Sequence, residues 1–185
     1  MWGEGTKPVL KNFFDTYNIK GAVISAVDLI RGIGNLSGLK VINVPGATGT
    51  VKTNFKGKAE AAIDALKDDM DFVYIHLEAP DESAHQGSLS DKLESIELID
   101  RHIVGPVYDY LKESKEEFRI LIMPDHPTPL SIKTHSSEPV PFLLVSDKEE
   151  ILFPERGFSE REAKETGIYE EYAHLLTDKM LKGLI

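Results

Sequence analysis

The feature that most constrains the fold is an alternation of apolar runs of strand length with segments of helical period. The runs at 72–77 and 119–123 are almost continuously apolar, which is typical of strands buried on both faces. Strands that alternate with helices predict an α/β fold with a mainly parallel central sheet and helices on both faces. The expected strands are residues 21–27, 40–44, 71–77, 118–123 and 140–145, and the expected helices are residues 10–17, 28–36, 58–67, 90–113 and 169–181.

The longest expected helix has an apolar stripe at spacings of three and four, the spacing that is typical of a helix with one apolar face. The stripe is formed by Leu93, Ile96, Ile99, Ile103 and Val107. Gly105 and Pro106 are expected to kink or split this helix, because proline lacks the backbone N–H that a helix needs. Residues 46–50 and 154–159 are expected to be loops, and the glycine-rich start at 1–8 resembles a connection between parts of a longer protein.

Composition narrows the class of protein. The 185 residues suit one domain spanning 1–185, and 21 basic against 31 acidic side chains give a net charge of -10. This charge argues against nucleic acid as a partner, and no apolar run approaches the ~20 residues that span a bilayer. We therefore expect a cytoplasmic protein that binds neither nucleic acid nor a membrane. The absence of Cys leaves His and carboxylates as the metal ligands.

Potential ligands follow or precede the expected strands, at the edge where open α/β sheets bind ligands. Asp81 and His85 come after the third strand, four residues apart, so they share one face if this segment is helical. A carboxylate oxygen and an imidazole nitrogen placed in this way can bind the same cation. The alternative is an Asp in a turn and a solvated His, and the spacing alone does not exclude it.

A second group surrounds the fourth and fifth strands. Asp125 and His126 follow the fourth strand between two prolines, Pro124 and Pro127, which favour a turn that lets neighbouring side chains face one cation. The alternative is that Asp125 caps the turn while His126 is exposed. His135 lies just before the fifth strand. Two Asp and three His give five potential ligands. Five are too many for one catalytic ion that keeps open coordination positions, and too few for two ions.

These blocks resemble the alkaline phosphatase superfamily, and most closely the cofactor-independent phosphoglycerate mutases of the archaeal type. The likeness rests on Glu-Ala-Pro-Asp-Glu-Ser-Ala-His at 78–85, Met-Pro-Asp-His-Pro-Thr-Pro at 123–129 and Thr-His-Ser-Ser-Glu-Pro-Val-Pro-Phe at 134–142. Upstream, Val-Asp-Leu-Ile-Arg-Gly-Ile-Gly at 27–34 and Val-Pro-Gly-Ala-Thr-Gly at 44–49 also resemble that family. The blocks stand in the family's order over nearly the whole chain. The implied fold is a three-layer α/β/α arrangement of the alkaline phosphatase type.

The resemblance implies two divalent ions, Mn²⁺ first and Zn²⁺, Co²⁺ or Mg²⁺ otherwise, and no 2,3-bisphosphoglycerate. By motif, Asp81, His85 and His135 correspond to the ligands of one ion, and Asp125 and His126 to part of the other set. Arg31 corresponds to a residue that contacts the phosphate of phosphoglycerate, although a solvated helix arginine is the alternative. His76, on an expected strand, is interpreted as a hydrogen-bonded core histidine.

Members of that family transfer the phosphoryl group of phosphoglycerate through a phosphoserine. Their nucleophilic Ser and a further Asp ligand come from an early segment whose motifs are not found in this sequence. We therefore assign no catalytic nucleophile. We expect a C-terminal portion of a phosphoglycerate mutase that is inactive alone and prone to self-association through an uncovered sheet edge. Alternatives are another phosphotransferase or phosphatase of the superfamily, such as a phosphopentomutase or a homoserine-kinase-like enzyme, and a non-catalytic metal-binding α/β domain.

Overall fold

The computed structural model describes residues 5–148 and 157–183. Residues 1–4, and residues 154–156 of the expected loop at 154–159, lie outside this range. Contacts within the chain group it into two units, which are described separately. The first unit comprises residues 1–83 and 88–107, and the second comprises residues 84–87 and 108–185.

The first unit is built on a three-stranded parallel sheet. Its strands are β1 (Gly21–Ile24), β2 (Lys40–Ile42) and β3 (Phe72–Ile75), in the order β2-β1-β3. Every residue of β1 is buried, because this small and apolar strand lies between the other two. β3 is only half-buried and Tyr74 is 44% exposed, so the expectation that this run is buried on both faces is wrong. The reason is its edge position in the described sheet.

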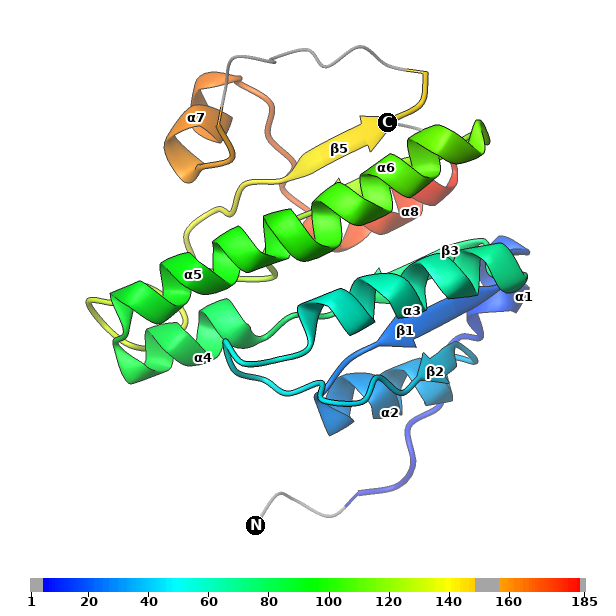
Figure 1. The fold of residues 1–185 in the computed structure, drawn as a ribbon, viewed down its shortest axis with the longest axis horizontal. Coiled ribbons are helices and arrows are strands. Elements are labelled where there is room, and N and C mark those ends of the chain that lie inside the picture. Colours follow the sequence, from blue (N-terminus) through cyan, green and yellow to red (C-terminus); the bar gives the residue numbers. More distant parts are fainter. Residues whose placement is uncertain (1–4, 149–156, 184–185) are drawn as a thin grey trace. The chain divides into compact units, whose positions relative to one another are not determined.

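Helices cover both faces of this sheet, as expected. The unit contains α1 (Phe13–Tyr17), α2 (Asp28–Leu36) and α3 (Phe55–Asp68), and α2 has the predicted bounds. The crossover through α2 leads from β1 to β2, and the crossover through α3 returns past β1 to β3. Right-handed crossovers in opposite directions place the two helices on opposite faces, as Figure 1 shows. On one face, Gly34 of α2 packs directly on Val23.

The long helix predicted at 90–113 is interrupted near Gly105 and Pro106. The structure has α5 (Leu89–Ile99), one π-helical turn (Asp100–Val104) and α6 (Gly105–Ser114) in succession. The Gly105 N–H donates to the carbonyl of Asp100, the wider spacing of a π-helix. Because Pro106 offers no N–H, the wider turn replaces a regular one ahead of it. The helix is thus locally rewound there rather than broken.

The apolar stripe of this helix is buried only in its second half. Ile103 is 4% exposed and packs with Phe55, Ala59 and Ala79 in the core of the first unit. Ile96 and Leu93 are 47% and 53% exposed, so the first half of the stripe does not belong to this core. The contacts explain this difference, since α3 packs against the π-helical turn.

The second unit is centred on an antiparallel pair, β4 (Arg119–Ile122) with β5 (Leu143–Ser146). This pair is an antiparallel exception in a fold expected to be mainly parallel, because residues 123–142 form no helix that could carry a parallel crossover. The unit also contains α7 (Glu160–Glu165), a 3₁₀ turn (Ala173–Leu175) and α8 (Leu176–Leu181), which packs on β4. All five expected strands are thus present, and the α/β class with a parallel sheet is confirmed.

Two further expectations concern helices. Only the second part of the helix expected at 169–181 forms, from the 3₁₀ turn onward. The short α7 was not expected, although Ser159 caps its start: the Ser159 hydroxyl accepts from the Glu162 N–H and donates to the Glu162 carboxylate. Within the described residues, no helix combines the length and the apolar character needed to cross a bilayer.

Candidate functional site

The segment after β3 is a helix, α4 (Ala79–Gln86), rather than an irregular turn. Pro80 stands in its first turn, where a missing N–H costs no hydrogen bond, and the Ser83 hydroxyl donates to the carbonyl of Ala79 at 2.7 Å. Asp81 and His85 are therefore one helical turn apart on one face. The two residues were candidate ligands of one ion on the condition that this segment is helical, and the structure meets that condition.

His85 is held in one tautomer by a backbone carbonyl. Its Nδ1 lies 2.9 Å from the carbonyl oxygen of Lys133. Because a carbonyl only accepts, Nδ1 carries the proton and the lone pair of a neutral ring is on Nε2. A backbone carbonyl on one ring nitrogen is the arrangement that orients metal-binding histidines. Gly87 permits this approach. It has φ +73°, and a Cβ at this position would lie only 2.5 Å from the Lys133 side chain.

Three histidines meet in the second unit. His85 Nε2 lies 3.1 Å from His135 Nε2, and the His126 and His135 rings are 3.7 Å apart between centroids. His126 and His135 each offer a ligand nitrogen, and these two nitrogens lie within 4.8 Å of each other. The alternative for the closest pair is a hydrogen bond in which His135 donates to His85.

Asp125 lies beside His126 and also shapes the local loop. Its Oδ1 accepts the His126 N–H at 3.1 Å, and its Oδ2 lies 3.5 Å from His126 Nε2. The other ring nitrogen, His126 Nδ1, lies 3.3 Å from the Thr128 hydroxyl. The hydrogen bond from the His126 N–H to Asp125 Oδ1 corresponds to the turn-capping role that the sequence left open for Asp125. Asp125 remains 78% exposed, so its carboxylate is also accessible to a cation.

The chemistry of these donors fits a divalent ion of intermediate softness. Imidazole and carboxylate ligands without any thiolate suit Mn²⁺, Zn²⁺ or Co²⁺. Two imidazole nitrogens bonded to one Zn²⁺ at ~2.0–2.1 Å each are about 3 Å apart, close to the separation of His85 Nε2 and His135 Nε2. The histidine arrangement in the second unit therefore suits a metal.

A row of polar residues follows the strands of the first unit. Ser25, Asn43 and His76 directly follow β1, β2 and β3, whose last residues stand in register at the carboxyl edge of the sheet. Ser25 Oγ lies 3.2 Å from His76 Nδ1 and accepts the Val27 N–H at 3.0 Å. The interpretation of His76 as a hydrogen-bonded histidine is therefore confirmed, but its expected core position is not, because the residue is only half-buried. Neither Ser25 nor Asn43 was a candidate from the sequence.

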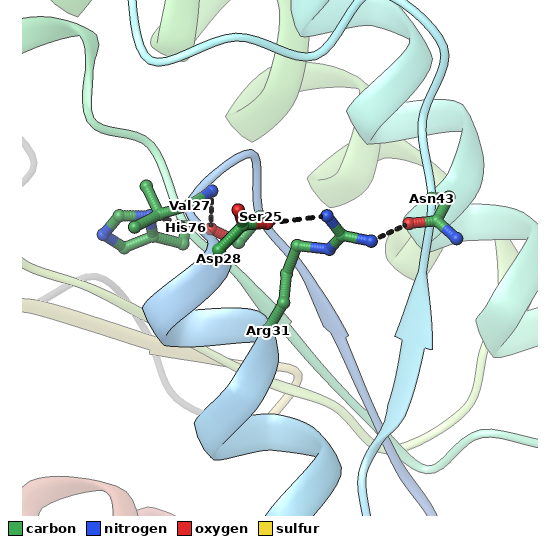
Figure 2. Close-up of polar contacts among 6 residues, drawn as sticks. All are labelled: Ser25, Val27, Asp28, Arg31, Asn43 and His76. Atoms are coloured by element: carbon green, nitrogen blue, oxygen red, sulfur yellow. Dashed lines mark hydrogen bonds and ion pairs between the residues drawn. The ribbon is translucent and has the colours of Figure 1, made fainter. Parts of the chain in front are cut away.

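Arg31 reaches this row from the second turn of α2, as Figure 2 shows. Its Nη1 donates to Asp28 Oδ1 at 3.0 Å and its Nη2 donates to Asn43 Oδ1 at 2.6 Å. The side chain is 36% exposed, so it is partly solvated as well as hydrogen-bonded at both terminal nitrogens. Arg31 presents an oriented guanidinium at the edge of the sheet.

Lys58 is a buried cation that the sequence analysis did not single out. It is 1% exposed, and its Nζ donates to the carbonyl oxygen of His76 at 3.2 Å. Burial lowers the pKa of Lys58, and the nearby carboxylate of Glu78 partly opposes this shift. Its spacing could have revealed it, because Lys58 lies three residues after Phe55, on the face of α3 that also carries Ala62. The lysine thus anchors the end of β3.

Comparison with known proteins defines the family. Residues 1–181 match the model of the metalloenzyme superfamily. The chain belongs to this superfamily. Among curated relatives, the 2,3-bisphosphoglycerate-independent phosphoglycerate mutase of Methanothrix thermoacetophila is 52% identical over 144 residues, which are 78% of this chain and 36% of that protein. A probable enzyme of the same name from Geobacter sulfurreducens is 46% identical over 181 residues, 98% of this chain and 45% of that protein.

Two solved structures have a similar fold. A protein from Pyrococcus horikoshii superposes with a TM-score of 0.73 at 34% identity, over 84% of this chain and 39% of that one. The cofactor-independent phosphoglycerate mutase of Thermoplasma acidophilum has a TM-score of 0.63 at 17% identity, over 95% and 39%, which shows a shared fold. The resemblance inferred from the motifs is confirmed. The chain spans about 36–45% of the length of these two curated relatives.

Proposed function

We propose that this metalloenzyme chain supplies the metal ligands, and one anion-binding arginine, of a phosphoglycerate mutase that interconverts 3-phosphoglycerate and 2-phosphoglycerate. The observation that carries the proposal is His85, whose Nδ1 is fixed by the Lys133 carbonyl while Nε2 faces His135. Related proteins of that name support the substrate class. The reaction would be a step of glycolysis, in the cytoplasm.

In the proposed site, Asp81, His85 and His135 bind one divalent ion, and Asp125 and His126 contribute to a second. Mn²⁺ is the proposed metal, and no 2,3-bisphosphoglycerate is required. Two bound cations supply charge stabilisation for an in-line phosphoryl displacement and favour the ionised form of a serine hydroxyl. The residues of this chain hold and orient those ligand atoms, while Arg31 binds an anionic group of the substrate.

The nucleophile is proposed to be a serine outside this chain, so that a phosphoserine forms and returns its phosphoryl group to the other hydroxyl. Ser25 is a poor candidate, because its hydroxyl accepts the Val27 N–H and faces His76. The 185-residue chain is therefore expected to give no product from 3-phosphoglycerate with Mn²⁺ when coupled to enolase. Turnover above background would place the nucleophile among the serines of this chain and contradict the proposal.

A titration with Mn²⁺ tests the metal ligands directly. Replacing His135 by Ala is expected to weaken Mn²⁺ binding at least ~10-fold, since the variant loses an imidazole that faces His85. His174→Ala is the matched control, because His174 is an exposed histidine of the same unit and contacts Tyr172 instead. Calorimetry that finds equal affinities for the two variants would refute the proposed site.

Self-association is a further part of the proposal. In the described sheet of the first unit, β2 and β3 are edge strands with one unpaired side each. Unpaired edges favour pairing with another chain, whereas the net charge of -10 opposes close association. We expect sedimentation velocity to show a concentration-dependent species larger than a monomer. A monomer at every concentration would contradict this expectation.

A further inference from the structure

The guanidinium of Arg31 is held at two of its three nitrogens by groups of different charge. Asp28, three residues earlier on α2, accepts a hydrogen bond from Nη1, while the neutral amide of Asn43 accepts one from Nη2. Figure 2 shows the guanidinium between these two side chains. Asn43 orients the group and leaves its charge unchanged, whereas Asp28 neutralises it.

The Asp28 contact is the weaker constraint. The Asp28 side chain is 94% exposed, and an exposed ion pair between neighbours on a helix contributes little, because water screens both charges. Asn43, in contrast, follows a strand whose register in the sheet fixes its backbone. An anion that arrives at Arg31 therefore meets a carboxylate that is easily displaced and an amide that stays in place.

The third nitrogen of Arg31 has bonding capacity left. Nε is buried and has no hydrogen-bond partner among the residues that the structure describes. A buried donor without an acceptor is unfavourable, because it has lost its hydrogen bonds to water and gained none in the protein. Arginine binds phosphate and carboxylate groups best through two parallel N–H donors, and each Nη nitrogen also keeps a second N–H. The resting contacts thus leave the guanidinium incompletely satisfied.

The position suits a ligand. Arg31 and Asn43 lie at the carboxyl edge of a parallel sheet, where α/β proteins bind their ligands, beside the Ser25–His76 pair. We propose that Asn43 is a positioning residue for Arg31, and that Asp28 is an internal counter-ion which an oxyanion of the ligand replaces. This inference rests on the proposed function only in taking Arg31 as the ligand-binding residue.

The two substitutions are expected to change anion affinity in opposite directions. Asp28→Asn removes the competing carboxylate, so inorganic phosphate should bind about fivefold more tightly. Asn43→Ala releases Nη2, so phosphate should bind about fivefold more weakly. Binding is measured on the 185-residue chain by calorimetry without metal, and urea unfolding of each variant shows whether the fold is intact. A purely structural role would not raise affinity in one variant and lower it in the other.

Two controls make the result decisive. Arg31→Met should abolish phosphate binding and make the Asp28 substitution silent when the two are combined. Asn43→Asp keeps an acceptor for Nη2 but adds a charge, so it should weaken phosphate binding like the alanine variant. Unchanged or weaker binding by Asp28→Asn, or no phosphate binding by any of these proteins, would overturn the inference. Because the experiment uses neither metal nor turnover, failure of the proposed mutase function would show separately, in the Mn²⁺ titration and the coupled assay.

Discussion

The two units position their polar side chains by different means. In the first unit, β1 is buried along its whole length, and polar residues follow each of three strands that are in register. In the second unit, a two-stranded sheet is accompanied by three histidines that come from α4 and the irregular segment 123–142. The polar row of the first unit is therefore fixed by the sheet, while the histidine cluster depends on loop contacts such as that of His85 with Lys133.

This difference indicates where order exists before a ligand binds. Backbone pairing along β1 holds Ser25 and Asn43 in place whatever their side chains contact. The histidines bring ring nitrogens together at 3.1 Å, which suits either one shared proton or one shared cation. A cation would thus add more order to the second unit than an anion would add to the first.

The largest effect is expected from breaking the packing of the first unit. A Cβ on Gly34 would lie 2.4 Å from Val23 Cγ1, so Gly34→Ala should lower the free energy of unfolding by about 3 kcal/mol. Gly32 is the matched control on the same helix, since a Cβ there meets nothing within 4 Å. Gly32→Ala should stabilise the protein by up to ~1 kcal/mol, because alanine favours a helix. Urea unfolding that finds the two variants equal would contradict the packing of α2 on β1.

Metal should selectively stabilise the segments that carry the proposed ligands, most of which lie in the second unit. At a Mn²⁺ concentration ~100 times the dissociation constant, the free energy of opening the segments that bind it should rise by about 2.7 kcal/mol. Hydrogen exchange should therefore slow in α4 and near His126 and His135, while β1 is unchanged. His135→Ala should remove the protection and His174→Ala should keep it. Equal protection of both units would mean that the comparison between them is wrong.

Much of the fold could be predicted from the sequence. All five strands and the bounds of α2 follow from short-range hydrophobic patterns, which depend on neighbours in the chain. Strand pairing depends on the path between strands, and the periodicity of residues 123–142 carries no information on it. The sheet was therefore expected to be only mainly parallel, and the structure shows that β4 and β5 form an antiparallel pair. Burial was also misjudged for β3, because a run of apolar residues does not reveal whether its strand lies at an edge.

Some residues of the candidate site could likewise be selected from the sequence, and others could not. Residues with distinctive chemistry, such as His85 and His126, could be selected because histidines beside strand ends stand out in a sequence. Asn43 could not, since its role arises only when register places it next to Arg31. Lys58 was missed because a lysine on an apolar helix face is usually assigned to the surface. The grouping of all five ligands around two ions stays a prediction.

A smaller effect concerns the cation buried in the first unit. Burial lowers the pKa of Lys58 in the folded protein below its ordinary value of 10.5. At any pH between the lowered pKa and 10.5, the unfolded chain therefore binds more protons than the folded chain. Stability should therefore rise with pH across this window. Lys58→Met removes the titrating group and should remove this rise while keeping the volume of the side chain. Lys56→Met, at an exposed position on the same helix, is the control and should keep the rise. Urea unfolding between pH 7 and 10 gives the slope, and an unaltered slope in Lys58→Met would refute the assignment.

The smallest effect is expected at the surface of the second unit, where Glu170 accepts a hydrogen bond from Lys179 of α8 and another from the Tyr172 N–H. The Lys179 contact, with the Tyr172 N–H as a second cause, lowers the pKa of Glu170 below its ordinary value of 4.5. A carboxyl with a depressed pKa in the folded state adds stability above pH 4.5, and this contribution is lost as the pH falls through the depressed value. Glu170→Gln should therefore unfold at a slightly lower temperature than the parent protein at pH 7, and the difference should disappear in acid. Glu171→Gln, at an exposed neighbouring position, should show little difference at either pH. A deficit of Glu170→Gln that persists below the depressed pKa would mean that lost packing, rather than the charge, is responsible.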